Sequence, residues 1–169
     1  MKALISVFNK DKVVEFARAL HELGIEIIAT EGTARAIATS RTQVTKVSDF
    51  TGFQEMLGGK VKTLHPRIHA GIATAEIRFV VVNLLPLALT PQKPLESMDV
   101  GGVAMLRSGI KNFEYVTVIV NPSRYQEVIA ELREKGHITR ETNLRLAREA
   151  SNYLRAYESL IGVLLERME

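Results

Sequence analysis

The stretch "GGKVKTLHPRIHAG", residues 58–71, concentrates side chains that can act on an anion. Lys60 and Lys62 are separated by one residue, so an extended backbone places both on one side, and the Thr63 hydroxyl follows directly. Two cations and a hydroxyl beside a pair of glycines are typical of a clamp for a polyanion or a developing oxyanion. An exposed loop of solvated lysines is the alternative interpretation.

Two histidines in the same stretch have a spacing that a metal site can use. His65 and His69 are four residues apart and would share one face of a helix. Pro66 indicates a turn or a helix start between them, and no third ligand follows at a recognisable spacing. We therefore expect no metal here.

Two further loops are expected at the same edge of a parallel sheet. Residues 3–8 and 25–30 are short apolar runs, and the residues between them have helical spacing until Gly24. Strand, helix and strand within about thirty residues form a βαβ unit, whose ligand loops lie at the carboxyl ends of its strands. This nominates residues 6–12 and 30–33.

The residue types in these two loops suit a phosphate. Thr30 and Thr33 offer hydroxyl donors, Gly32 leaves the backbone N–H groups accessible at a helix start, and Ser6 and Lys10 approach from the neighbouring loop. Glu31 is an unfavourable neighbour for a phosphate unless its side chain points to solvent. A simple turn capped by Thr33 is the alternative.

A fourth motif, "DVGGVAMLRSGIKN" at residues 99–112, pairs a carboxylate with a glycine-rich helix start. Asp99 precedes Gly101 and Gly102, whose N–H groups can approach a ligand closely. If this helix runs straight to Lys111, that lysine lies roughly 13 Å from Asp99. One site would then contain both only if the lysine side chain folds back or a second subunit intervenes.

The remaining pattern predicts one α/β domain. Residues 79–85 and 116–120 are continuous, β-branched runs typical of buried parallel strands. Ser123 is the predicted N-cap of a helix to Lys135, and Thr139 opens a long helix to Glu169. We expect residues 46–72 and 86–101 to be irregular and functional.

Composition excludes several classes of protein. The chain has 169 residues, 22 basic and 19 acidic side chains and a formal charge of +3, without a basic block, so we expect no nucleic-acid partner. The absence of cysteine excludes disulfides and thiolate catalysis. No apolar run reaches about 18 residues and no signal peptide is evident, so we expect no membrane partner and a cytoplasmic protein.

Together, "GGKVKTLHPRIHAGI", "VVVNLLP", "DVGGVAMLRSGIKN" and "LAREASNYLRAYESLI" resemble the inosine monophosphate (IMP) cyclohydrolase domain of the bifunctional purine biosynthesis protein. The resemblance covers nearly the whole chain. It implies a methylglyoxal-synthase-like fold, a single-domain three-layer sandwich with a mostly parallel central sheet, and a homodimer without a cofactor. The reaction it implies is closure of 5-formamidoimidazole-4-carboxamide ribonucleotide to IMP with loss of water.

The resemblance also implies roles for single residues. Phosphate binding falls to Ser6, Lys10, Thr30, Gly32 and Thr33, with help from Lys60 and Thr63. Catalysis falls to Lys62, Asp99 and Lys111, and Asn83 and the Gly101 amide lie near the base. The chain ends where the family's transformylase domain would begin, so residues 1–169 are expected to be a cyclohydrolase domain without formyl transfer.

Several positions depart from the family pattern. Leu85 replaces a tyrosine whose hydroxyl is implicated in the chemistry, Lys60 replaces an arginine, and Phe8, Asn9 and Asp11 alter the first loop. A non-catalytic nucleotide-binding or regulatory module on the same fold is therefore the alternative function. Methylglyoxal synthase is a third possibility, against which the "KTLHP" and "GGVAMLRSGIKN" elements count.

Overall fold

The computed structural model describes residues 1–54, 56, 62–87 and 95–167, and these residues form a five-stranded sheet in which every pairing is parallel. The strands are β1 (Lys2–Val7), β2 (Glu26–Ala29), β3 (Thr45–Lys46), β4 (Ile77–Asn83) and β5 (Thr117–Ile119). Their order is β3-β2-β1-β4-β5. The chain thus moves outward from β1 to one side and then returns to its other side, which makes the gap between β1 and β4 the topological switch point.

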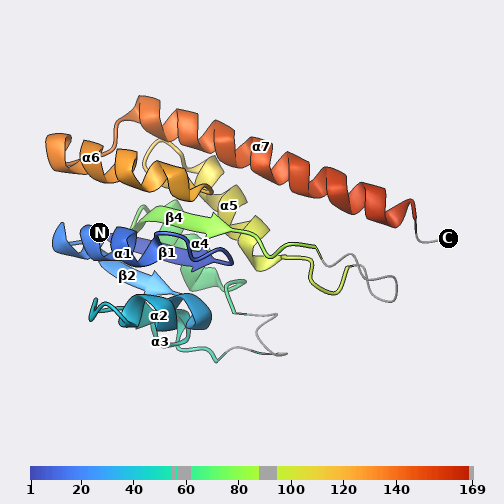
Figure 1. Ribbon diagram of the computed structural model, residues 1–169, viewed down its shortest axis with the longest axis horizontal. Coiled ribbons are helices and arrows are strands. Elements are labelled where there is room, and N and C mark those ends of the chain that lie inside the picture. Colours follow the sequence, from blue (N-terminus) through green and yellow to red (C-terminus); the bar gives the residue numbers. More distant parts are fainter. Residues whose placement is uncertain (55, 57–61, 88–94, 168–169) are drawn as a thin grey trace.

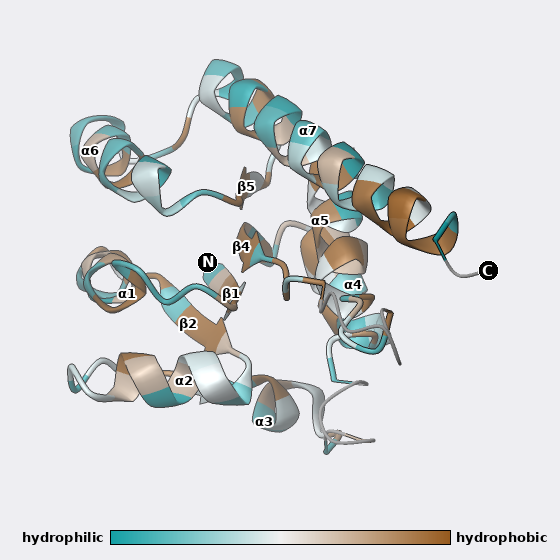
Figure 2. Cartoon of the chain, turned by 45° about the vertical axis from the view of Figure 1, so that its right-hand side comes forward, coloured by the Kyte–Doolittle hydropathy of each residue, from teal (hydrophilic) through white to brown (hydrophobic). Residues whose placement is uncertain are grey.

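Helices cover both faces of this sheet (Figure 1 and Figure 2). Their bounds are α1 (Val13–Glu22), α2 (Glu31–Ala38), α3 (Val47–Thr51), α4 (Pro66–Ala73), α5 (Gly101–Lys111), the 3-10 helix η2 (Pro122–Arg124), α6 (Tyr125–Lys135) and α7 (Arg140–Leu165). In Figure 2, α1 and α2 lie on one side of the strands and α4 and α5 on the other. The predicted α/β three-layer architecture is confirmed.

Alternate residues of each strand enter two separate cores. Ile5 and Val81 belong to the core beneath α1 and α6, whereas Leu4 and Val80 belong to the core beneath α4 and α5, and all four are 0% exposed. Burial on both faces explains why these strands are apolar at nearly every position. The sheet is therefore a rigid platform for the loops at its carboxyl edge.

Most predicted boundaries lie within two residues of the observed ones. Gly24 follows α1 with a φ of 76°, a left-handed conformation that glycine adopts without strain. Thr139 caps α7, accepting a hydrogen bond from the Thr142 amide at 3.4 Å. Strands were predicted at the positions of β1, β2, β4 and β5, and each of them is observed.

Two predictions about local structure were wrong. Ser123 is not the N-cap of α6: it lies inside η2, where Asn121 Oδ1 accepts its backbone N–H at 3.0 Å, and α6 begins at Tyr125. Residues 46–72 are not irregular throughout, because they contain α3 and the start of α4. Helices of five to eight residues offer too few turns for an apolar period to be visible in the sequence.

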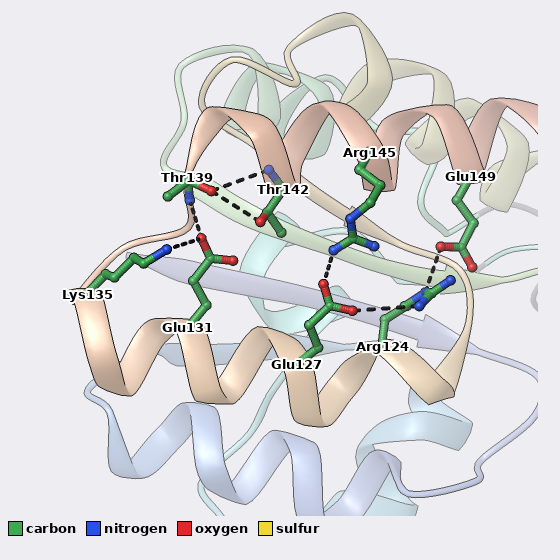
Figure 3. A network of polar contacts seen from close by, with 8 residues as sticks. All are labelled: Arg124, Glu127, Glu131, Lys135, Thr139, Thr142, Arg145 and Glu149. Carbon is green, nitrogen blue, oxygen red and sulfur yellow. Dashed lines mark hydrogen bonds and ion pairs between the residues drawn. The ribbon is translucent and has the colours of Figure 1, made fainter.

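A network of charged side chains fixes α7 against η2 and α6 (Figure 3). Arg124 lies 2.9 Å from Glu149 and 3.7 Å from Glu127, and Arg145 pairs with the same Glu127. Glu131 accepts the Thr139 backbone N–H at 3.0 Å, which joins the end of α6 to the cap of α7. Isolated surface pairs contribute little, but a shared network sets the position of a long helix.

α7 has 26 residues, about 39 Å, and extends past the rest of the described chain (Figure 1). No helix within the described ranges combines the length and the apolar character that crossing a bilayer requires. Tyr153 and Tyr157 of α7 reach the loops after β4, so the helix contributes to the functional edge of the sheet.

Candidate anion-binding site

Hydroxyl groups from the loops after β1 and β2 meet at the carboxyl edge of the sheet. Thr30 Oγ1 lies 3.3 Å from Ser6 Oγ and 3.4 Å from Thr33 Oγ1. Thr33 Oγ1 is anchored in turn by the backbone N–H of Val7 at 3.3 Å. The structure thus brings together the three hydroxyl side chains that the sequence nominated from two separate loops.

Two lysines lie beside these hydroxyls. The Lys10 ammonium donates hydrogen bonds to the carbonyl oxygens of Val7 and Phe8, the latter at 3.2 Å. Burial lowers the pKa of Lys10, and the nearby charge of Lys62 lowers it further. Two cations close enough to repel each other form a place where a bound anion would relieve that repulsion.

The first turn of α2 carries Gly32 and Glu31. Gly32 is exposed, and a Cβ built on it would have no neighbour within 4 Å, so this turn is open to a ligand. The Glu31 carboxylate does not simply face solvent: it pairs with Lys46 at 3.3 Å, toward β3. This ion pair offsets the negative charge that the sequence places beside the phosphate loop.

Thr63 lies directly against the start of α5. Its side chain is 3% exposed, and a Cβ built on Gly101 would lie only 2.4 Å from Thr63 Oγ1. Gly101 is therefore required for this close approach, and the segment carrying Lys62 sits at the N-terminus of α5. Lys60 lies outside the described residues.

The Asp99 carboxylate is held by backbone groups. Its Oδ1 accepts the Gly102 N–H at 2.7 Å and its Oδ2 accepts the Leu85 N–H at 3.2 Å. A carboxylate offers about four acceptor positions, so about two remain for a ligand. Asp99 thus bonds the first turn of α5 and presents a fixed acceptor beside the end of β4.

Asn83, the last residue of β4, fixes the first loop. Its Oδ1 accepts the Asn9 N–H at 2.7 Å and its Nδ2 donates to the Asn9 carbonyl oxygen at 3.1 Å. The side chain is largely buried, with the residue 9% exposed. The amide thereby ties the loop after β1 to the end of β4.

Lys111 lies apart from this cluster. It is the exposed last residue of α5, whose eleven residues span about 15 Å, whereas Asp99 precedes the first turn. Because α5 is continuous, it keeps Lys111 and Asp99 of one chain apart.

Residues 12–100, more than half of the chain, match the MGS-like domain family. The chain belongs to this family. Residues 109–169 of this MGS-like protein match a second family, the AICARFT/IMPCHase bienzyme.

Its relatives include the bifunctional purine biosynthesis protein PurH of Persephonella marina, 42% identical over 186 residues that cover 97% of this chain and 36% of that protein. PurH of Bacillus cytotoxicus is also 42% identical, over 184 residues covering 95% of this chain and 36% of the relative. The MGS-like chain thus spans about a third of the length of these relatives. The crystal structure of ForH superposes with a TM-score of 0.86 at 33% identity, covering 98% of both chains.

A cavity of about 370 Å³ opens at the tips of β2 and β3 in this MGS-like domain. Its polar lining includes Thr30, Glu31, Arg35, Lys46 and Lys62. Sequence reasoning missed Arg35 and Lys46. The four-residue spacing from Glu31 to Arg35 places both on one face of α2, and this spacing was visible in the sequence. Lys46 had no such signal, because β3 is only two residues long.

A second cavity, of about 420 Å³, lies at the tips of β1, β4 and β5. Phe8, Asn83 and Tyr153 are among its lining residues. The Asn83 amide is bonded to Asn9, and Tyr153 accepts the Leu84 N–H at 2.9 Å. Both polar side chains support the loops of the domain.

The two histidines of the opening motif have different partners. His65 Nδ1 accepts the Arg67 N–H at 3.1 Å and caps α4, whereas His69 Nδ1 lies 2.7 Å from Ser108 Oγ. Within the described ranges no cluster of three potential metal ligands occurs. The contacts of His65 and His69 therefore belong to the capping and packing of α4.

Proposed function

We propose that this MGS-like domain is an IMP cyclohydrolase of purine biosynthesis, which closes 5-formamidoimidazole-4-carboxamide ribonucleotide to IMP. The observation that carries the proposal is the convergence of a hydroxyl cluster, two repelling lysines and a fixed carboxylate on one sheet edge. The matches to the AICARFT/IMPCHase family and to PurH support the same activity. On this proposal residues 1–169 act as one cyclohydrolase unit in the cytoplasm.

The phosphate of the substrate would occupy the hydroxyl cluster. Ser6, Thr30 and Thr33 can each turn a hydroxyl proton toward a phosphate oxygen, and the open turn at Gly32 offers backbone N–H groups at a positive helix end. Lys10 supplies a cation from the neighbouring loop, and we assign Lys60 the same role. A bound phosphate dianion would attract Lys10 and Lys62 and so offset the repulsion between them.

The imidazole carboxamide would then extend toward α5. Its amide nitrogen attacks the formyl carbon of the same molecule, the formyl oxygen gains negative charge, and that oxygen finally leaves as water. Because both reacting groups belong to one substrate, holding them in contact supplies much of the rate. What the protein must add is charge stabilisation and proton transfer.

We assign Lys62 to the developing oxyanion and Asp99 to the carboxamide N–H. Lys62 precedes Thr63, which touches the first turn of α5, so its backbone lies near the Asp99 end of that helix while its side chain lines the neighbouring cavity. On this proposal its ammonium turns from the cavity toward the formyl oxygen when the substrate binds. The free acceptor positions of Asp99 suit an amide proton, and we assign the Gly101 N–H and Asn83 to positions beside the base.

Lys111 would serve a site only through a second copy of the chain. The length of α5 separates it from Asp99 of its own chain, so we assign it to proton transfer across a homodimer. Within this proposal a complete site needs two subunits.

A non-catalytic nucleotide-binding module is the second candidate, and Leu85 favours it. This residue stands where the family tyrosine is expected, it is 38% exposed, and its side chain offers no hydroxyl. Both functions bind the phosphate at the hydroxyl cluster, and only the cyclohydrolase turns the nucleotide over.

A spectrophotometric assay of the formylated ribonucleotide, run beside calorimetric titration with IMP, separates the two functions. We expect the wild type to form IMP and Asp99→Asn to lower turnover by about 10²–10⁴-fold with little change in IMP affinity. Leu85→Tyr should raise turnover. Tight IMP binding without product formation by the wild type would instead establish the binding module, and equal losses of turnover and affinity in Asp99→Asn would contradict the chemical role of Asp99.

A further inference from the structure

The cavity at the tips of β2 and β3 borders the hydroxyl cluster of Ser6, Thr30 and Thr33. Thr30 belongs to both, since its hydroxyl contacts Ser6 and Thr33 while its residue lines the cavity. Lys62 also belongs to both, because it lines the cavity and its charge acts on Lys10. The cavity and the hydroxyl cluster are therefore immediate neighbours that share two residues.

The strand order places this cavity on the far side of the phosphate from the reacting groups. Asp99 binds the backbone just after β4, the hydroxyl cluster lies at β1 and β2, and the cavity lies at β2 and β3. Figure 2 shows α2 and α3, which flank the cavity, at the edge of the molecule away from α5. A nucleotide with its base toward α5 would therefore direct any additional phosphate into the cavity.

The cavity carries more positive than negative charge. Arg35, Lys46 and Lys62 line it together with one carboxylate, Glu31, a difference of two positive charges. Glu31 lies 3.3 Å from Lys46, with side chains 33% and 49% exposed respectively. Arg35 forms no ion pair with any residue of the described ranges, although it lies one helical turn from Glu31.

We propose that this cavity binds the terminal phosphate of a purine nucleoside diphosphate, so that such nucleotides compete with the substrate of the proposed cyclohydrolase. The inference rests on the proposed function for the position of the first phosphate. Arg35 and Lys46 hold the second phosphate, and Lys46 exchanges its bond with Glu31 for one with the ligand. The guanidinium of Arg35 provides paired donors suited to phosphate oxygens.

Glu31 makes the cavity selective for a ligand that carries enough charge. While the cavity holds no anion, the Glu31 carboxylate keeps Lys46 oriented toward the cavity. A terminal phosphate must outcompete it, whereas a nucleoside monophosphate, held at the hydroxyl cluster, leaves the Glu31–Lys46 pair in place. Replacing Glu31 by glutamine should therefore strengthen binding of the diphosphate more than binding of the monophosphate.

Calorimetric titration of the full chain with inosine diphosphate and with IMP tests the inference. We expect the wild type to bind the diphosphate about tenfold or more tightly than IMP, the gain expected from added charge-assisted hydrogen bonds. Lys46→Ala and Arg35→Ala should each reduce this preference while leaving IMP affinity unchanged. Lys135→Ala, which removes an exposed charge on α6, is the matched control and should retain the preference.

The possible failures are distinguishable. Equal affinities for the two nucleotides, or a preference that survives in the Lys46→Ala, Arg35→Ala double variant, would overturn the subsite. Failure of the wild type to bind IMP at all would overturn the proposed function. In that case the cavity is tested alone by titrating pyrophosphate and, separately, orthophosphate into the wild type and the double variant. A preference for pyrophosphate that the double variant loses supports the subsite. No preference for pyrophosphate in the wild type refutes it.

Discussion

The Tyr157 hydroxyl accepts a hydrogen bond from the Asp99 backbone N–H at 2.9 Å and donates one to the Leu85 carbonyl oxygen at 3.0 Å. Asp99 Oδ2 returns a contact to the Leu85 N–H at 3.2 Å, so three groups form a closed ring. Burial raises the pKa of Tyr157, which keeps the hydroxyl protonated and able to donate. α7 thus fixes the backbone that carries the proposed catalytic carboxylate.

Tyr157→Phe should therefore affect turnover more than nucleotide binding. The substitution leaves the Asp99 N–H and the Leu85 carbonyl without this partner, a loss of about 1 kcal/mol in the free energy of unfolding. Because the carboxylate is then less well fixed, we expect kcat to fall while the affinity for IMP changes little. Cyclohydrolase kinetics and urea denaturation measure the two effects.

Tyr153→Phe is the matched control. Tyr153 lies one turn earlier on α7 and accepts the Leu84 N–H at 2.9 Å, with no hydrogen bond to Asp99. We expect a similar loss of stability with turnover retained. Equal losses of turnover in the two variants would show that the tyrosines only stabilise the fold.

The contact between Gly101 and Thr63 predicts the sign of a second substitution. Gly101→Ala would place a Cβ 2.4 Å from Thr63 Oγ1, so the threonine or the helix must shift. We expect a loss of about 1–3 kcal/mol in the free energy of unfolding, measured by urea denaturation. The displaced Lys62–Thr63 segment should also weaken IMP binding.

Gly162→Ala provides the comparison within α7, where a Cβ meets nothing within 4 Å. The same substitution should there stabilise the protein by up to about 1 kcal/mol, since alanine is the better helix former. Adding Thr63→Ala to Gly101→Ala should recover part of the lost stability. If the double variant is no more stable than Gly101→Ala, the clash is not the cause.

Much of the fold could be predicted because its signals are local. The continuous apolar strands, Gly24 and the Thr139 cap each follow from the propensity of a few neighbouring residues. Ser123 misled because Asn121, two residues earlier, is the cap that is used: its Oδ1 accepts the Ser123 N–H and begins η2 before α6. Capping preference ranks both residue types as good caps, and only the tertiary path of the chain decides between them.

The site was predictable where the sheet topology alone brings residues together. Ser6, Thr30 and Thr33 meet because parallel neighbouring strands end at one edge. The Glu31–Lys46 pair and the role of Tyr157 depend on contacts between segments distant in sequence, which no local pattern encodes. The charge of Glu31 was visible in the sequence, but its partner was not.

Lys10 gives the proposed site a defined pH dependence. Its pKa is lowered in the folded chain by burial and by the charge of Lys62, from an unfolded value of 10.5. Between the two pKa values the unfolded chain binds more protons, so this group makes stability rise with pH in that window. A bound phosphate favours the protonated ammonium, so nucleotide affinity should change in the opposite direction and fall as pH rises through the lowered pKa.

Titrating IMP into the wild type and Lys10→Arg between about pH 7.5 and 10.5 checks this sign, because phosphate remains a dianion there and arginine stays charged. We expect wild-type affinity to decline at a pH below the ordinary lysine range and Lys10→Arg to decline much less. If both proteins lose affinity over the same pH window, Lys10 does not bind the phosphate in its charged form.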